Sequence, residues 1–204
     1  MQPPVLLPRA VHAEIIAHAQ EGAPEEVCGL LRGRGNRAAE LFRAENLAED
    51  KLNNYIVDPK ALLHQFHFED LGDEMMGIYH SHPASVAYPS ASDAWHAYYP
   101  DSAYFICSLA QADAPAIRAF RLIPRFLAPS PKQMADLLAQ IPFHESRPAL
   151  FAHFQAADKA VAPALAVLAE ATAAPYYVLF TGDPEWDGSE VRLVTVREAP
   201  VLLV

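Results

Sequence analysis

The amino-acid sequence predicts an α/β fold, in which short buried strands alternate with amphipathic helices. Hydrophobic residues make up 52% of the 204 residues, which is enough for a sizeable core. Short apolar runs typical of strands alternate with stretches in which apolar residues recur at three- and four-residue spacing. Eighteen prolines against eight glycines indicate stiff connections between these segments.

The expected strands share a run of apolar, β-branched or aromatic residues that ends at a turn or a proline. The tetrapeptide at residues 33–36 contains two glycines and an asparagine, which predicts a hairpin between the strands on either side of it. In chain order, the expected strands are Val5–Leu7, Val27–Arg32, Arg37–Glu45, Tyr55–Val57, Met75–His82, Tyr104–Leu109, Ile117–Leu122, Tyr176–Phe180 and Val191–Val196.

The expected helices begin at capping residues or at a proline in the first helical position. Asp58 followed by Pro59 predicts one such start, and Leu62, Leu63 and Phe66 are the expected buried face of that helix. The other expected helices begin at Pro8 and end near Gly22, or cover residues 91–99, Lys132–Gln140 and the alanine-rich Ala156–Ala174.

The bulk properties exclude several classes of protein. A formal net charge of −10 provides no basic surface for nucleic acid or for an anionic membrane. The N-terminal residues lack the basic and apolar regions of a signal peptide, and no apolar run is long enough to cross a membrane. Cys28 and Cys107 both lie in strand-like runs, which favours two buried thiols in a reducing cytoplasm.

The segment from Gly77 to Trp95 carries a pattern typical of a metal site. His80 and His82 alternate on one strand, so their side chains project from the same face, roughly 7 Å apart along the chain. Ser90 and Asp93 then form a helix-start pattern, which by itself predicts only a cap. Two imidazoles and one carboxylate make the three-ligand set that a catalytic zinc uses, with water in the fourth position. The combined pattern therefore favours a zinc site at His80, His82 and Asp93.

A second motif supplies the carboxylate that a zinc hydrolase needs as a base. The run Glu26-Val27-Cys28-Gly29-Leu30-Leu31, together with His80-Ser81-His82-Pro83 and Ser90-Ala91-Ser92-Asp93, resembles the JAMM (MPN-plus) metallopeptidases, and most closely the compact prokaryotic members. The resemblance covers residues 5 to 126. Alignment on the Cys-Gly pair makes Glu26, and not Glu25, the glutamate of the family.

The resemblance implies the fold, the activity and the partners. The expected fold is a curved mixed β-sheet flanked by helices, of the JAMM/MPN (cytidine-deaminase-like) type. The expected activity is zinc-dependent hydrolysis of the peptide or isopeptide bond after the C-terminal glycine of a ubiquitin-like or sulfur-carrier protein, whose extended tail an edge strand would hold. Glu26 is the expected general base, and Ser90 the expected hydrogen-bond donor to the oxyanion.

Three alternatives belong to other classes. A RadC-like, DNA-repair-associated protein has the same histidine and Ser-x-x-Asp spacing, but the acidic charge and the Glu26 motif disfavour it. A non-catalytic MPN interaction scaffold would lack one or more motif residues, whereas all are present. A zinc deaminase would need a Cys-x-x-Cys pair, which neither Cys28 nor Cys107 forms.

The expected domain organisation is a metallopeptidase domain at residues 1–126, followed by an extension at residues 127–204. The extension carries no recognised motif and is expected to contain helices and then two strands. Its expected role is packing or dimerisation, and the alternative is a surface that guides the substrate. Among the other histidines, His64 and His67 have a metal-compatible spacing without a nearby third ligand, and His96 is expected outside the ligand set.

Overall fold

The computed structural model describes residues 3–145, 149–155, 174–181 and 191–204. Its contacts divide the chain into two compact units. The first contains Met1–Tyr88, Asp101–Arg121 and Glu198–Val204, and the second contains Pro89–Pro100 and Leu122–Arg197.

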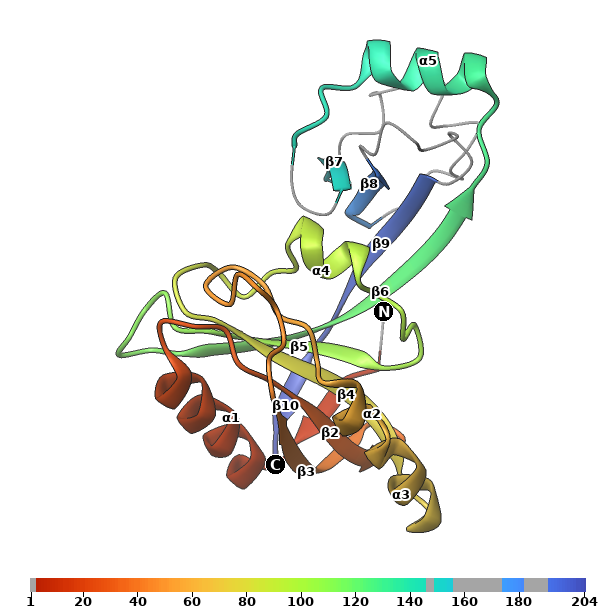
Figure 1. Ribbon diagram of the computed structural model, residues 1–204. Helices are drawn as coiled ribbons and strands as arrows, with labels where there is room; N and C mark the ends of the chain where they lie inside the picture. Colours follow the sequence, from red (N-terminus) through yellow and green to blue (C-terminus); the bar gives the residue numbers. More distant parts are fainter. Residues whose placement is uncertain (1–2, 146–148, 156–173, 182–190) are drawn as a thin grey trace. The chain divides into compact units, whose positions relative to one another are not determined.

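A mixed β-sheet forms the centre of the first unit (Figure 1). Its elements are β1 (Val5–Leu7), α1 (Arg9–Gly22), β2 (Cys28–Arg34), β3 (Arg37–Ala44), α2 (Pro59–Leu62), α3 (His64–Asp70), β4 (Glu74–His82), β5 (Ala103–Ser108), the beginning of β6 (Ala116–Leu127) and β10 (Val201–Leu203). The strand order is β10-β1-β3-β2-β4-β5-β6. β4 pairs antiparallel with β2 and parallel with β5, so the strand with both histidines has a neighbour on each side.

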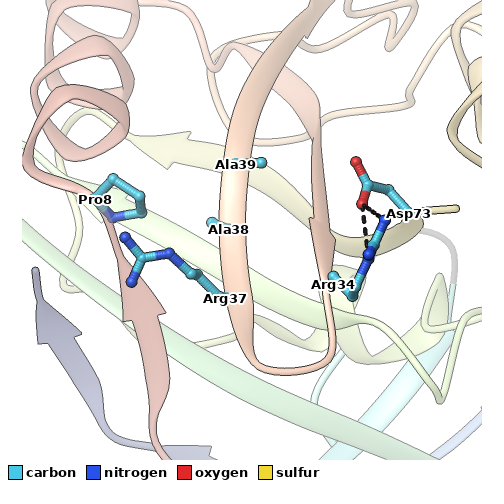
Figure 2. A pocket seen from close by; sticks show the side chains of 6 residues that line it. All are labelled: Pro8, Arg34, Arg37, Ala38, Ala39 and Asp73. Atoms are coloured by element: carbon cyan, nitrogen blue, oxygen red, sulfur yellow. Dashed lines mark hydrogen bonds and ion pairs between the residues drawn. The ribbon is translucent and has the colours of Figure 1, made fainter. Parts of the chain in front are cut away.

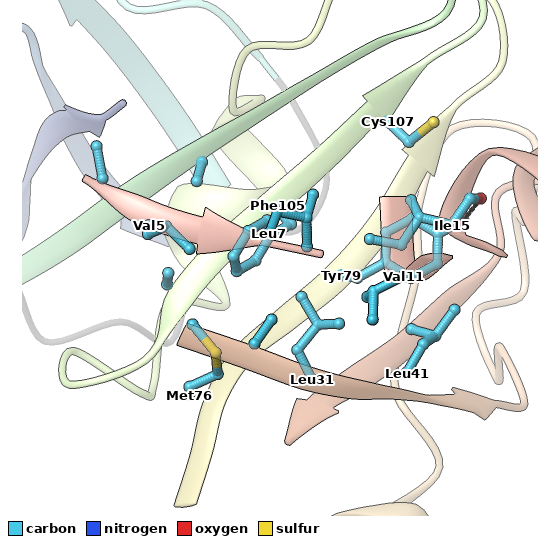
Figure 3. Close-up of a cluster of buried hydrophobic side chains, with 14 of the residues drawn as sticks. Val5, Leu7, Val11, Ile15, Leu31, Leu41, Met76, Tyr79, Phe105 and Cys107 are labelled. Atoms are coloured by element: carbon cyan, nitrogen blue, oxygen red, sulfur yellow. Dashed lines mark hydrogen bonds between the residues drawn. The ribbon is translucent and has the colours of Figure 1, made fainter. Parts of the chain in front are cut away.

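The two faces of this sheet carry different helices. Leu31, Tyr79 and Phe105 lie in one buried cluster with residues of α1 (Figure 3). Successive strand residues face opposite sides, so Ile78 and His80 lie on the other face. On that face, the ring of Phe68 in α3 packs against the ring of Phe42 in β3, with 4.8 Å between their centroids.

The second unit consists of α4 (Ala91–Trp95), the end of β6, α5 (Pro131–Gln140), β7 (Ala149–Phe154), β8 (Tyr176–Thr181) and most of β9 (Val191–Ala199). Its strand order is β6-β9-β8-β7. A capping box between Ser130 and Gln133 begins α5, as a Ser-x-x-Gln pattern predicts. Met134 and Leu137 of α5 pack in a buried cluster that includes Val178 of β8.

Most of the expected elements form, with shifts of one to a few residues at their ends. Three expectations are wrong. Tyr55–Val57 is not a strand, because only Val57 forms an isolated bridge with Asn46. Leu63 and Phe66 are 61% and 59% exposed, because the expected helix divides into α2 and α3 at Leu63, and Phe68 becomes the buried residue.

The third correction concerns the helix after Ser90, which ends at Trp95 and not at residue 99. β7 and β10 were not expected from the sequence. The expected alanine-rich helix at Ala156–Ala174, and the turn region that the sequence predicts between the last two expected strands at Thr181–Gly188, lie almost entirely outside the described residues. Both cysteines are free and buried, which confirms the expected thiols. Within the described part of the chain, no helix is long and apolar enough to cross a membrane.

Candidate functional site

His80 and His82 stand at the end of β4 with their rings turned toward each other. Their Nε2 atoms are 3.0 Å apart, and the ring centroids are 4.9 Å apart at an interplanar angle of 62°. Both residues are buried. Their backbones pair with Ile106 and Ser108 of β5, so the strand, and not a flexible loop, positions both imidazoles.

Each ring is held by a second contact. The Nδ1 atom of His82 lies 2.8 Å from the carbonyl oxygen of Val86. Since a carbonyl oxygen only accepts, this bond places the proton on Nδ1 and leaves a lone pair on Nε2, as a metal ligand requires. The ring of His80 stacks on Tyr55, with 4.1 Å between centroids and an interplanar angle of 16°.

Asp93 is positioned by the first turn of α4. The Asp93 backbone N–H donates to Ser90 Oγ at 3.1 Å, and the Ser90 backbone N–H donates to Asp93 Oδ2 at 2.7 Å. This is a complete capping box, with Asp in the position that Glu usually takes. Because Ser90 Oγ accepts from a backbone N–H, its own O–H can still donate.

His80, His82 and Asp93 form a group whose ligand atoms all lie within 4.8 Å of one another. Two nitrogens bound to one tetrahedral zinc at about 2.0–2.1 Å are about 3.3 Å apart, close to the separation of the two Nε2 atoms. The donor set and its spacing therefore fit zinc. Among the described residues this is the one such group of three or more, and it contains neither His64, His67 nor His96.

Glu26 and Glu25 have different environments. Glu26 is 6% exposed, whereas Glu25 is exposed to solvent. The antiparallel register pairs Cys28 with His80, and the Ser81 N–H donates to the Val27 carbonyl oxygen at 2.9 Å. Continued by two residues from the Cys28–His80 pair, this register puts Glu26 opposite His82 on the same face of the sheet, as the general-base assignment needs.

Three hydrogen bonds hold the backbone at Glu26 and Val27. Its N–H donates to the Lys51 carbonyl oxygen at 2.6 Å, and its carbonyl oxygen accepts from Asn46 Nδ2 at 2.8 Å. The next N–H, of Val27, donates to Ser81 Oγ at 2.9 Å. Ser81 points to the sheet face opposite His80 and His82, so the residue between the two histidines also positions the glutamate.

Asn46 and Tyr55 are site residues that the sequence did not identify. The buried Asn46 side chain makes four hydrogen bonds: Nδ2 donates to Glu26 O and Asn54 O, and Oδ1 accepts from Ala48 N and Ile56 N. It thereby closes the loop that carries Tyr55. The sequence shows only an asparagine at the start of a polar connection, and this signal does not reveal which backbone groups it binds.

Cys28 is unsuited to act as a nucleophile. Burial, and then the neighbouring Glu26 carboxylate, raise the pKa of its thiol to about 12. At neutral pH it is a protonated, buried thiol, and reactive cysteines instead have a lowered pKa. The carboxylate and imidazole groups are therefore the chemically useful ones at this site.

A hollow of about 490 Å³ lies elsewhere in the first unit, at the hairpin of β2 and β3 (Figure 2). In Figure 2, Pro8 and Arg37 lie on one side of β3, and Arg34 and Asp73 lie on the other. Arg34 Nη2 is 3.1 Å from Asp73 Oδ1, so part of the positive charge in this hollow is neutralised. It contains none of the motif residues.

Comparison with known proteins identifies the family to which this chain belongs. The family model described as prokaryotic homologs of the JAB domain matches residues 8–123. The desampylase of Haloferax volcanii is 38% identical over 101 residues, which are 46% of this chain and 73% of that protein. The CysO-cysteine peptidase of Mycobacterium tuberculosis is 30% identical over 124 residues, covering 60% and 85% of the two chains. A protein of Desulfitobacterium hafniense with a solution structure is 34% identical, with a TM-score of 0.52 over 57% of this chain and 82% of that chain.

Proposed function

Because the chain belongs to the prokaryotic homologs of the JAB domain, we propose that it is a zinc-dependent peptidase or isopeptidase. Its proposed substrate is the bond after the C-terminal glycine of a ubiquitin-like or sulfur-carrier protein. The observation that carries this proposal is the grouping of His80, His82 and Asp93, whose ligand atoms lie close enough to hold one metal ion. The strand register also assigns Glu26 to the sheet face of the two histidines.

The names of the relatives support the substrate class. They include a desampylase, a CysO-cysteine peptidase and, in Thermus thermophilus, a probable TtuB-protein conjugate cleaving protease. The last is 36% identical over 88 residues, which are 43% of this chain and 59% of that protein. Two of these names specify a peptidase or protease, and one of them specifies cleavage of a protein conjugate.

In the proposed reaction, His80, His82 and Asp93 would hold the metal. Bound zinc supplies Lewis-acid polarisation and makes water acidic enough to ionise near neutral pH. The Glu26 carboxylate accepts the proton of the attacking water and then delivers it to the departing amine, which is too basic to leave unprotonated. The Ser90 hydroxyl donates a hydrogen bond to the oxyanion that develops on the scissile carbonyl.

The test is cleavage of a ubiquitin-like protein fused through its terminal glycine to a reporter amine. We expect the wild type to cleave this fusion, to lose activity after treatment with a chelator, and to regain it when zinc is returned. The matched control is the same fusion with valine in place of the terminal glycine, which should resist cleavage. Cleavage that survives complete removal of the metal would contradict the proposal.

A further inference from the structure

The helix that carries Asp93 is too short to be stable by itself. α4 has five residues, and isolated helices shorter than about 12 residues are marginal in water. Its capping box orders the first turn but does not attach the helix to the rest of the protein. The segment Pro89–Pro100 instead belongs to the same compact unit as Leu122–Arg197, and α4 contacts β7 and β8 of that unit (Figure 1).

Tyr177 of β8 holds the beginning of the helix. Its hydroxyl donates to the carbonyl oxygen of Pro89, the residue before Ser90, at 2.7 Å in a buried position. Tyr177 is 5% exposed, and its ring stacks on the ring of His153 of β7, with 4.4 Å between centroids. Since β8 pairs with β7 on one side and β9 on the other, this hydroxyl has a rigid support.

Arg192 of β9 holds the other end. Its Nη1 atom donates to the carbonyl oxygen of Trp95, the last residue of α4, at 2.7 Å. The guanidinium group also lies over the Trp95 ring, 4.1 Å from its centroid, and 5.3 Å from the centroids of Tyr98 and Phe126. A planar guanidinium suits this combination of stacking and hydrogen bonding, whereas a lysine ammonium does not.

We infer that Tyr177 and Arg192 are positioning residues that hold Ser90 and Asp93 in the geometry needed to bind zinc. This inference rests on the metal site of the proposed function and assigns a role to the segment at residues 122–197. A ligand on a loosely held helix must be ordered when the metal binds, and the free energy of that ordering weakens the affinity. The strands of this segment therefore set the zinc affinity of a site that contains none of their own side chains.

The experiment measures zinc affinity by competition with a chromophoric chelator in the full chain. Tyr177→Phe removes one hydrogen bond and little packing, and Arg192→Met removes the charge and the bond to Trp95. We expect zinc to bind on the order of tenfold more weakly in each variant, the lower end of the effect of residues that orient metal ligands. Arg192→Lys should be intermediate, because it keeps the charge but not the planar group.

Tyr79→Phe is the matched control. The Tyr79 hydroxyl also donates to a backbone carbonyl oxygen in a buried position, that of Ile15 at 3.2 Å, but on the α1 face of the first unit. We expect Tyr79→Phe to lower thermal stability without changing the zinc affinity. An equal loss of zinc affinity in this control would show a general effect of destabilisation and would overturn the positioning role.

Amide hydrogen exchange of the zinc-free protein provides a second measurement. Exchange at Asp93 and Ala94 should be faster in Tyr177→Phe and Arg192→Met than in the wild type, and unchanged in Tyr79→Phe. Wild-type zinc affinity together with wild-type exchange in both variants would overturn the inference while leaving the proposed function intact. Absence of zinc binding in the wild type itself would instead overturn the proposed function, and this inference with it.

Discussion

The side chain of Asn46 donates a hydrogen bond from Nδ2 to the backbone carbonyl oxygen of Glu26 at 2.8 Å. The same amide group binds Asn54 O, and its oxygen accepts two backbone N–H groups. One buried side chain thus connects the proposed general base to the loop whose Tyr55 stacks on His80.

Asn46→Asp tests this connection. The aspartate keeps the two acceptor contacts but loses both donor contacts, and it brings its carboxylate close to two carbonyl oxygens. We expect the free energy of unfolding to fall by about 1–3 kcal/mol, and kcat to fall more than KM changes, because Glu26 loses its position. Chemical denaturation and steady-state kinetics measure these effects. Wild-type kcat and stability in Asn46→Asp would contradict a role of this connection in placing Glu26.

Single substitutions in the ligand set should remove the metal. In His80→Ala, His82→Ala and Asp93→Ala only two protein ligands remain. We expect elemental analysis after dialysis to find much less than one zinc per chain in each variant. The exposed His67 belongs to no metal-binding group among the described residues, so His67→Gln should retain it. Equimolar zinc in His82→Ala would disprove the ligand assignment.

Gly29 of the second motif is required by packing. A Cβ atom at this position would overlap the backbone carbonyl oxygen of Phe42 on the neighbouring strand. Backbone cannot rotate away as a side chain can, so Gly29→Ala should lower the free energy of unfolding by about 1–3 kcal/mol. Urea denaturation checks this. Unchanged stability would mean that β2 and β3 are farther apart than the structure places them.

Stability should depend on pH through His18. Burial, and then the positive charge of Arg43, lower the pKa of its imidazole from 6.5 to about 4. As the pH falls from about 6.5 to about 4, the unfolded chain therefore binds a proton that the folded chain does not, and stability decreases across that window. Above it, His18 is neutral in both states and contributes no pH dependence.

His18→Gln isolates this contribution. We expect urea midpoints of this variant to decrease less between pH 7 and pH 4 than those of the wild type, because the variant lacks that proton uptake. His67→Gln, at an exposed position, should follow the wild type. Parallel pH profiles in His18→Gln and the wild type would contradict the lowered pKa of His18.

The grouping of His80, His82 and Asp93 could be predicted from the sequence because the features that orient each side chain are local. Alternation along one strand puts His80 and His82 on one face, and a capping box orients Asp93. Glu26 is buried and Glu25 is exposed, and the motif alignment likewise selects Glu26.

The supporting residues could not be predicted, because their partners are distant in the chain. Tyr177 and Pro89 are separated by 88 positions, and Arg192 and Trp95 by 97. The periodic pattern of apolar residues in a sequence gives no information about contacts between residues so far apart. The error at Leu63 and Phe66 has a different cause, since a break between two short helices changes which residues face the core, and a single 3.6-residue period cannot show this.

Zinc content and cleavage, measured together in the wild type, Glu26→Gln and Glu25→Gln, test the central claim most directly. We expect equimolar zinc in all three proteins, because neither glutamate is a proposed ligand. We expect normal cleavage in Glu25→Gln and a loss of about 10²–10⁴-fold in Glu26→Gln, the usual effect of removing a general base. Cleavage by Glu26→Gln at the wild-type rate, or a wild type without zinc, would contradict a zinc hydrolase with Glu26 as its base.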